Sequence, residues 1–233
     1  MPRSPDHPIR LLLAVDTSGK NGSMALASVF NSDDQIKVVE TVALTGGTFS
    51  AQLVPQVAAL LETHGFKKSE LIGFVAVSGP GSFTGLRVGL AAIKALSDVL
   101  QKPIAAISLL EAIARSGSGQ GRVCSALEAG RGEIYVGDYE VGPPVRMHRE
   151  RLLSREEFFA EARDRAVVTP DADLAAAARQ AGCRVEHIDY PRADVIAHFG
   201  WERIRRGETI RAEELEANYI RRSDAEIFSK PKF

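Results

Sequence analysis

The sequence has few of the side chains that build disulfide frameworks or thiolate metal sites, and it has no excess of positive charge. Its 233 residues include two cysteines, Cys124 and Cys183, and neither lies in a C-x-x-C motif. This argues against a disulfide framework or a cysteine zinc site, and we expect both thiols to pack as small hydrophobic groups. With 29 basic and 30 acidic residues, the net charge is -1, so no overall field attracts nucleic acid or membrane.

Histidine pairs and the common nucleotide-binding and nucleophile motifs are also missing. No two histidines form an H-x-x-x-H pair, so we expect no metal site. The five histidines are His7, His64, His148, His187 and His198. The glycine-rich segment 78–89 lacks both the G-x-G-x-x-G spacing and the Lys-Ser/Thr that ends a P-loop. The residues two positions before and after Ser82 are Pro80 and Thr84, whereas a G-x-S-x-G elbow has glycines there. We therefore do not expect a catalytic serine.

A secretory leader is not expected either. Residues 1–8 are polar and rich in proline, and the apolar run that follows them is short and resembles a strand. The sequence therefore predicts a cytoplasmic protein. Its apolar content of 45% is sufficient for a hydrophobic core.

The most informative segment present is Ser78–Gly89, which joins a strand to a helix. The apolar run 71–77 contains β-branched residues, Gly79-Pro80-Gly81 interrupts it, and from Leu86 the apolar residues recur at helical spacing. A strand, turn and helix in this order leave free N–H groups at the helix start. Such groups can bind a phosphate or carboxylate, or allow another backbone to approach closely.

The order of the predicted elements favours a two-lobed α/β fold. We expect strands at 9–15, 23–30, 36–44, 71–77 and 104–107, with helices at about 50–64 and from Leu86 onward. This βββαβαβ order fits the ribonuclease-H-like layer of actin and the sugar kinases. Pro55 either marks the true start of the first helix or bends its first turn.

The second half of the chain repeats this layout in outline. A predicted strand at 123–127 ends at Glu128 and returns at 133–140, just as the first strand ends at Asp16 before a turn. Further helices are expected to open at Ser108 and Ser154, each followed three residues later by glutamate. A short strand is expected at Val167-Val168, followed by an alanine-rich helix that runs to Gly182. We therefore predict duplicated βββαβα lobes, 1–107 and a smaller, degraded 108–233, although a hairpin that recurs by chance is an alternative.

The helix that begins near Leu86 has two apolar faces. One contains Leu86, Leu90, Ile93 and Leu100, and the other contains the smaller Val88, Ala91, Ala92, Ala95 and Val99. The first face would pack on the core. The second, with Gly85 and Gly89, would either receive a partner helix or be buried by the chain itself, and the sequence leaves both alternatives open.

Four segments resemble the bacterial TsaB family of tRNA threonylcarbamoyladenosine biosynthesis proteins, which are glycoprotease-like members of the ASKHA superfamily. The resemblance is carried by 13–18, by the G-P-G-S-F-T-G-L-R core within 78–89, by the hairpin 127–135 and by Tyr219-Ile220-Arg221. Two departures affect side chains. Phe49-Ser50-Ala51 replaces the usual H-S-E, and in the hairpin Glu128 and Gly130 replace aspartate and arginine.

The resemblance implies a non-catalytic subunit that pairs with the catalytic TsaD through two helices of its first lobe. In that family TsaE, an ATPase, binds the pair, TsaC supplies threonylcarbamoyl-AMP, and TsaD modifies adenosine 37 of tRNAs that read codons starting with A. The implied interface residues are Phe49, Leu53, Val57, Leu60, Phe83, Arg87, Val88, Ala91, Ala92 and Ala95. The alternatives are a homodimer through the same helices when TsaD is absent, and a glycoprotease-like or nucleotide-hydrolysing enzyme that acts alone.

Nucleotide binding is a separate question, because Asp16-Thr17-Ser18 occupies the place of a phosphate loop in this fold. Asp16 could position a metal-bound water, but we favour a role in capping its own turn. We expect no cofactor of the chain's own. ATP or ADP held jointly with TsaD is a further hypothesis, in which Arg87 contributes positive charge.

Arginines near the C-terminus could indicate a tRNA contact. They are Arg203, Arg205, Arg206, Arg211, Arg221 and Arg222, and glutamates are interleaved with them. Mixed signs on a helical stretch are typical of a solvated surface with local ion pairs. We therefore expect any role toward tRNA to be indirect.

Overall fold

The computed structural model describes residues 9–29, 35–163 and 165–221. The chain divides into two compact units. Among the described residues, unit 1 contains 9–29, 35–78, 84–107 and 192–217, and unit 2 contains 79–83, 108–163, 165–191 and 218–221. No helix among the described residues is long and apolar enough to span a membrane.

Unit 1 is built on a five-stranded sheet in the order β3-β2-β1-β4-β5. Its strands are β1 (Arg10–Asp16), β2 (Gly22–Val29), β3 (Ile36–Leu44), β4 (Leu71–Gly79) and β5 (Ile104–Ser108). β1 is antiparallel to β2 and parallel to β4. These are the strands that the sequence predicts, with ends shifted by one or two residues.

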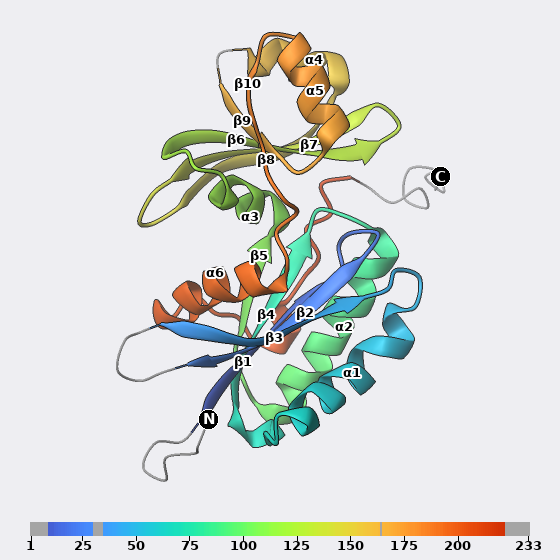
Figure 1. Ribbon diagram of the computed structural model, residues 1–233, viewed down its shortest axis with the longest axis vertical. Coiled ribbons are helices and arrows are strands. Elements are labelled where there is room, and N and C mark those ends of the chain that lie inside the picture. Colours follow the sequence, from blue (N-terminus) through green and yellow to red (C-terminus); the bar gives the residue numbers. More distant parts are fainter. Residues whose placement is uncertain (1–8, 30–34, 164, 222–233) are drawn as a thin grey trace, which may run out of the picture. The chain divides into compact units, whose positions relative to one another are not determined.

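Helices cover both faces of this sheet (Figure 1). α1 (Phe49–Thr63) and α2 (Phe83–Leu100) lie on one face, and α6 (Ala193–Arg205) lies on the other. Two short 3₁₀ helices, η1 (Lys68–Glu70) and η2 (Ala212–Glu214), complete the unit. Pro55 lies inside α1, so the alternative in which the helix starts near this proline is wrong.

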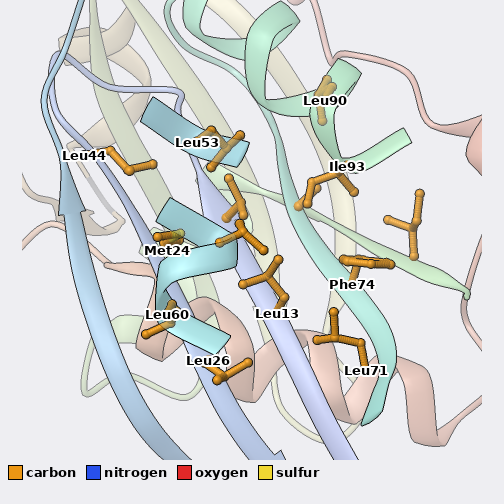
Figure 2. Close-up of a cluster of buried hydrophobic side chains, with 14 of the residues drawn as sticks. Leu13, Met24, Leu26, Leu44, Leu53, Leu60, Leu71, Phe74, Leu90 and Ile93 are labelled. Atoms are coloured by element: carbon orange, nitrogen blue, oxygen red, sulfur yellow. The ribbon is translucent and has the colours of Figure 1, made fainter. Parts of the chain in front are cut away.

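The main core of unit 1 lies between the sheet and the helices α1 and α2 (Figure 2). Alternate residues of β1 face this layer, because successive strand side chains point to opposite faces. Leu11, Leu13 and Val15 therefore pack with Leu53 of α1 and Ile93 of α2. On the opposite face, α6 packs so closely that a Cβ at Gly200 would lie 2.2 Å from a methyl carbon of Val75.

The observed division of the chain differs from the expected boundary at residue 107, because the segment that contains α6 belongs to unit 1. Residues 192–217 return to unit 1, where Ala193, Ile196, Ala197, Gly200 and Trp201 are buried. The N–H of Ala193 also donates to Ser23 Oγ of β2 at 2.9 Å. The apolar side of this helix is obscured in the sequence by the arginines and glutamates at its C-terminal end.

Unit 2 repeats the strand topology of unit 1, with the sheet order β10-β9-β6-β7-β8. Its strands are β6 (Gly121–Gly130), β7 (Glu133–Val141), β8 (Arg146–Ser154), β9 (Ala166–Thr169) and β10 (Arg184–His187). β6 is antiparallel to β7 and parallel to β9, as β1 is to β2 and β4. The predicted duplication is confirmed, and β8 and β10 are strands that the sequence analysis missed.

The helices of unit 2 are shorter than those of unit 1, in agreement with the predicted reduction of the second lobe. They are α3 (Leu109–Ser116), α4 (Arg155–Ala162) and α5 (Ala172–Gln180). Ser108 caps α3 by accepting the Leu110 N–H, and Ser154 and Glu157 form a capping box on α4. Both helix starts are therefore confirmed. Cys124 and Cys183 are buried, unpaired and part of one apolar cluster, which confirms their predicted packing role.

Candidate functional site

The junction between β4 and α2 depends on glycines at three positions. Gly79 has a φ of +119°, a conformation that residues with a Cβ rarely adopt. Further along, Gly85 and Gly89 are buried against Thr17. A Cβ at Gly85 would lie 2.1 Å from the Thr17 carbonyl oxygen, and one at Gly89 would lie 2.1 Å from Thr17 Oγ1. These glycines therefore serve an internal contact, not the approach of a partner helix that their spacing suggested.

The Asp16-Thr17-Ser18 turn is closed by this contact. All three residues are buried, with relative exposures of 1%, 2% and 3%. Thr17 Oγ1 donates to the Gly85 carbonyl at 2.8 Å, and the Ser18 N–H donates to Asp16 Oδ1 at 2.8 Å. The predicted capping role of Asp16 is confirmed. The residues named as a possible phosphate or nucleotide site are thus buried and make hydrogen bonds within the chain, and their use for a phosphate stays a prediction.

The inner face of α1 also corrects an expectation. Phe49, Leu53, Val57 and Leu60 are each at most 6% exposed and belong to the core of unit 1. They face their own sheet because they recur at the spacing of one helical face. These four side chains are therefore not on the surface, and the part of α1 that a partner could reach lies on the opposite side.

The outer face of α1 is composed of small apolar residues. They are Ala51, Val54, Pro55, Ala58 and Ala59, and all five are exposed. Val54 is 52% exposed, and the charged residue Glu62 lies near the C-terminal end. Helical periodicity alone could have identified this face, because it lies opposite the Leu53 stripe.

The outer face of α2 has the same character. Ala91, Ala95 and Val99 are exposed, and Val99 has an exposure of 76%. Val88 and Ala92 are half-buried and pack against the core cluster that contains Phe49. These five residues are the smaller apolar stripe that the sequence predicts. Arg87, Lys94 and Asp98 border this stripe, because Arg87 and Lys94 lie one turn from Ala91 and Asp98 lies one turn from Ala95.

The helices α1 and α2 lie on the same face of the sheet, and their starts are in contact (Figure 1). The ring of Phe49, the first residue of α1, lies 3.3 Å from the position of a Cβ at Gly85, in the first turn of α2. We call the exposed apolar residues of both helices the helical face. It comprises Ala51, Val54, Pro55, Ala58 and Ala59 of α1 with Ala91, Ala95 and Val99 of α2. A group of exposed apolar residues on adjacent helices is one mark of a protein-binding surface.

The hairpin of unit 2 that corresponds to the Asp16 turn is held by the chain's own polar groups. The Glu128 N–H donates to Asp171 Oδ2 at 2.6 Å, and the Glu128 carboxylate pairs with Arg155 at 3.0 Å. Arg221 donates to the Ala129 carbonyl at 3.0 Å and pairs with Glu133 at 2.9 Å. The two acids identified by their similar position, Asp16 and Glu128, are both engaged within the chain.

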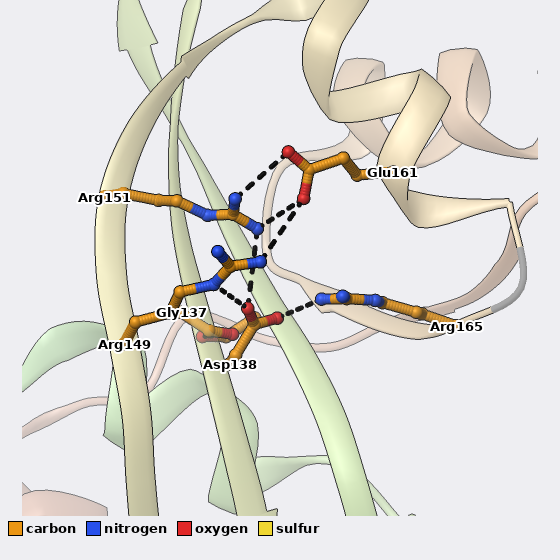
Figure 3. A network of polar contacts seen from close by, with 7 residues as sticks. Gly137, Asp138, Arg149, Arg151, Glu161 and Arg165 are labelled. Atoms are coloured by element: carbon orange, nitrogen blue, oxygen red, sulfur yellow. Dashed lines mark hydrogen bonds and ion pairs between the residues drawn. The ribbon is translucent and has the colours of Figure 1, made fainter.

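A second polar network in the same unit joins β7 and β8 to α4 (Figure 3). Asp138 of β7 is 6% exposed and pairs with Arg149 and Arg151 of β8, at 2.8 and 3.4 Å, and with Arg165. Arg151 also pairs with Glu161 of α4 at 2.6 Å. The network joins two strands, a helix and the segment before β9, and we assign it a structural role.

The C-terminal arginines form local ion pairs, as predicted from their mixed charge pattern. Arg206 pairs with Glu208 at 2.7 Å, and Arg211 pairs with Glu213 at 2.8 Å. Arg203 donates to the Ala106 carbonyl at 2.7 Å. Arg222 lies outside the described residues. Within the described residues, no group of three or more His, Cys, Asp or Glu side chains is arranged to hold a metal ion.

The fold and the helical face define a two-unit α/β protein of the actin type, and comparisons with known proteins identify its family. The family model described as "TsaD: tRNA N6-adenosine threonylcarbamoyltransferase" matches residues 43–160. This match covers slightly more than half of the chain, and the chain belongs to that family.

Curated relatives refine the comparison. The tRNA threonylcarbamoyladenosine biosynthesis protein TsaB of Bacillus subtilis is 32% identical over 130 residues, which are 55% of this chain and 55% of that protein. The TsaB of Escherichia coli is 27% identical over 132 residues, covering 55% and 54%. The chain thus spans about half the length of these relatives. The predicted resemblance to TsaB is confirmed.

Solved structures confirm the predicted fold over nearly the whole chain. A Pseudomonas aeruginosa protein described as similar to peptidase YEAZ has a TM-score of 0.72 at 25% identity, and it covers 91% of this chain and 100% of its own. YeaZ from the same organism has a TM-score of 0.69 at 23% identity, with coverages of 90% and 99%. The ribonuclease-H-like, actin/ASKHA-type fold class is therefore confirmed.

Substitution of Gly89 by alanine tests the contact with Thr17. We expect the variant to lose roughly 1–3 kcal/mol of unfolding free energy, because the new methyl group has no space beside Thr17. Thr17→Ala in the same chain should restore part of this loss, so the two substitutions should not be additive in urea unfolding. Gly119→Ala is the control, since the nearest side-chain atom to its Cβ would lie at 3.7 Å. Additive losses would contradict the contact.

Substitution of Asp16 by asparagine tests the burial of its charge. Burial raises the pKa of Asp16 above the ordinary value of 3.8, although bonds from Ser18 lower it. Above the folded-state pKa the buried carboxylate is charged and costs stability. As the pH falls through that pKa, the folded protein takes up a proton before the unfolded chain does, so the stability contribution of Asp16 rises.

Asparagine keeps an oxygen for the Ser18 donors and carries no charge. The stability of Asp16→Asn relative to the natural chain should therefore be most favourable near pH 7 and should decline as the pH approaches 4. Urea unfolding at several pH values measures this difference. A relative stability that grows toward low pH would show that the pKa of Asp16 is lowered instead.

Proposed function

We propose that this protein acts in tRNA threonylcarbamoyladenosine biosynthesis as a non-catalytic partner subunit of TsaD. The observation that carries the proposal is the helical face. Its residues are exposed and apolar on two neighbouring helices, whose inner faces already form the core of unit 1. The family match and the TsaB relatives supply the pathway and the candidate partner.

The size and chemistry of the helical face support binding to another protein. A specific interface buries on the order of 1,600 Å² in total, and the exposed sides of two long helices can provide much of one partner's share. Alanines and valines allow close approach between helices at little cost in side-chain entropy. In the absence of TsaD, a second copy of this chain would cover the same surface, so the homodimer and the TsaD complex should exclude each other.

A non-catalytic role is supported by the hydrogen bonds that the chain itself makes at the two corresponding hairpins. In unit 1, Thr17 and Asp16 bond within the chain, and in unit 2, Arg221 and Asp171 bond to the hairpin backbone. On this proposal the reaction centre belongs to TsaD, and TsaE binds the assembled pair. This chain acts on tRNA only through TsaD. The chain has no cofactor of its own.

Introducing charge into the helical face should weaken the complex. Ala91→Asp and Ala95→Asp place a carboxylate at exposed positions of α2, where partner binding would desolvate it. We expect the affinity for TsaD, measured by titration calorimetry, to fall by at least about tenfold for the double variant. Val88 and Ala92 are less suitable positions, because they also pack against the core.

The control for this experiment is Ala176→Asp, at an exposed position within α5 of unit 2. It carries the same helix-propensity cost as each substitution in α2. The α2 variants and the control should retain similar melting temperatures, and the control should bind TsaD normally. Unchanged affinity in the folded double variant would exclude the helical face as the TsaD-binding surface.

A nucleotide held jointly with TsaD is a narrower part of the proposal. Arg87 lies in the second turn of α2 and is exposed, so it could contribute charge toward ATP or ADP at the interface. Arg87→Ala should then reduce nucleotide binding by the complex while leaving its assembly intact. If nucleotide affinity does not change, Arg87 takes no part in such a site.

A further inference from the structure

The last described residues, Asn218–Arg221, contact three segments of unit 2 that are far apart in the sequence. We call these four residues the terminal strap. Asn218 Nδ2 donates to the carboxylate of Glu150 on β8. Arg221 donates to the Ala129 carbonyl and pairs with Glu133 in the β6–β7 hairpin. The strap is thus fastened on both sides of Tyr219.

Tyr219 contacts the beginning of the helix that carries half of the helical face. Its ring lies 4.8 Å from the ring of Phe83, centroid to centroid, with an interplanar angle of 37°. Such tilted aromatic pairs contribute beyond their buried area. Phe83 is the first residue of α2 and belongs to unit 2, whereas α2 continues in unit 1 from Thr84. The contact therefore holds the point at which α2 begins.

The start of α2 follows a glycine-rich turn, and Thr17 contacts the helix only from its third residue, Gly85. Gly79 and Gly81 lie directly before the helix, and glycine gives a backbone more accessible conformations than any other residue. The first turn of a helix also lacks part of the internal hydrogen bonding that holds later turns. A side chain that packs on Phe83 reduces the freedom of both the turn and the helix start.

We propose that the terminal strap positions the first turn of α2. Tyr219 contacts Phe83, while Asn218 and Arg221 bind the strap to unit 2. The strap would thereby link the β6–β7 hairpin to Phe83 within unit 2. The positioning of α2 is independent of the proposed function. Only its consequence for a partner, a helical face held ready for TsaD, rests on that function.

Hydrogen exchange of the chain alone tests the strap. In Tyr219→Ala and Arg221→Ala, amides of residues 87–90, which bond to carbonyls of the first turn of α2, should exchange about fivefold faster because local opening becomes easier. Tyr219→Phe keeps the ring and should exchange at the natural rate. Arg211→Ala is the matched arginine control, since its side chain is 75% exposed and pairs with Glu213 and Glu214.

The outcomes separate the strap from general destabilisation and from the proposed function. Faster exchange confined to 79–90 and 128–135, with normal rates in Tyr219→Phe and Arg211→Ala, supports the strap. If Tyr219→Ala is unstable as a whole, Arg221→Ala alone decides. Unchanged exchange at 87–90 in Arg221→Ala overturns the proposal.

Affinity for TsaD is then measured with the same variants. Weaker binding by Tyr219→Ala and Arg221→Ala, and normal binding by Tyr219→Phe, would extend the strap's role to the partner. If the natural chain does not bind TsaD at all, the proposed function fails, while the exchange result still stands.

Discussion

The packing of Thr17 against Gly85 and Gly89 is the contact on which the arrangement of unit 1 depends. Because neither glycine has a Cβ, α2 approaches the turn after β1 closely enough for Thr17 to donate to the Gly85 carbonyl. This contact fixes the rotation of α2 about its axis. Leu90 and Ile93 then face the core, and Ala91 and Ala95 face outward. The same contact buries Thr17, so one interaction both orients α2 and closes the turn after β1.

Unit 2 preserves the topology of unit 1 but stabilises it with polar contacts. Asp138 joins β7, β8 and the segment before β9 through three arginines, and Glu150 accepts hydrogen bonds from Ser108, Tyr139 and Asn218. Its strands β9 and β10 have four residues each, and its helices are short. A small apolar core explains this reliance on ion pairs, since short elements bury little hydrocarbon surface. The hairpin, the strap and the start of α2 meet in this unit.

The sequence was sufficient to predict the strands of unit 1, the turn before α2, both serine caps and the duplication, because each has a local signal in apolar alternation, glycine or capping chemistry. It failed where that signal is weak. β8 was missed because this edge strand carries arginines and is exposed for half its length. α6 was not assigned to unit 1, since its return is a long-range contact. On α1, resemblance placed Phe49 and Leu53 at an interface, whereas the helical spacing of these residues matches a face that packs on the sheet.

The central claim is that this chain contributes a binding surface to a reaction carried out by TsaD. The most direct test is reconstitution of threonylcarbamoyladenosine formation on tRNA with TsaC, TsaD and TsaE from one organism, with and without this chain. The account predicts that the chain co-purifies with TsaD and that the modified nucleoside is formed only when the chain is present. Full modification without it, or turnover by this chain alone with no TsaD complex, would contradict the account.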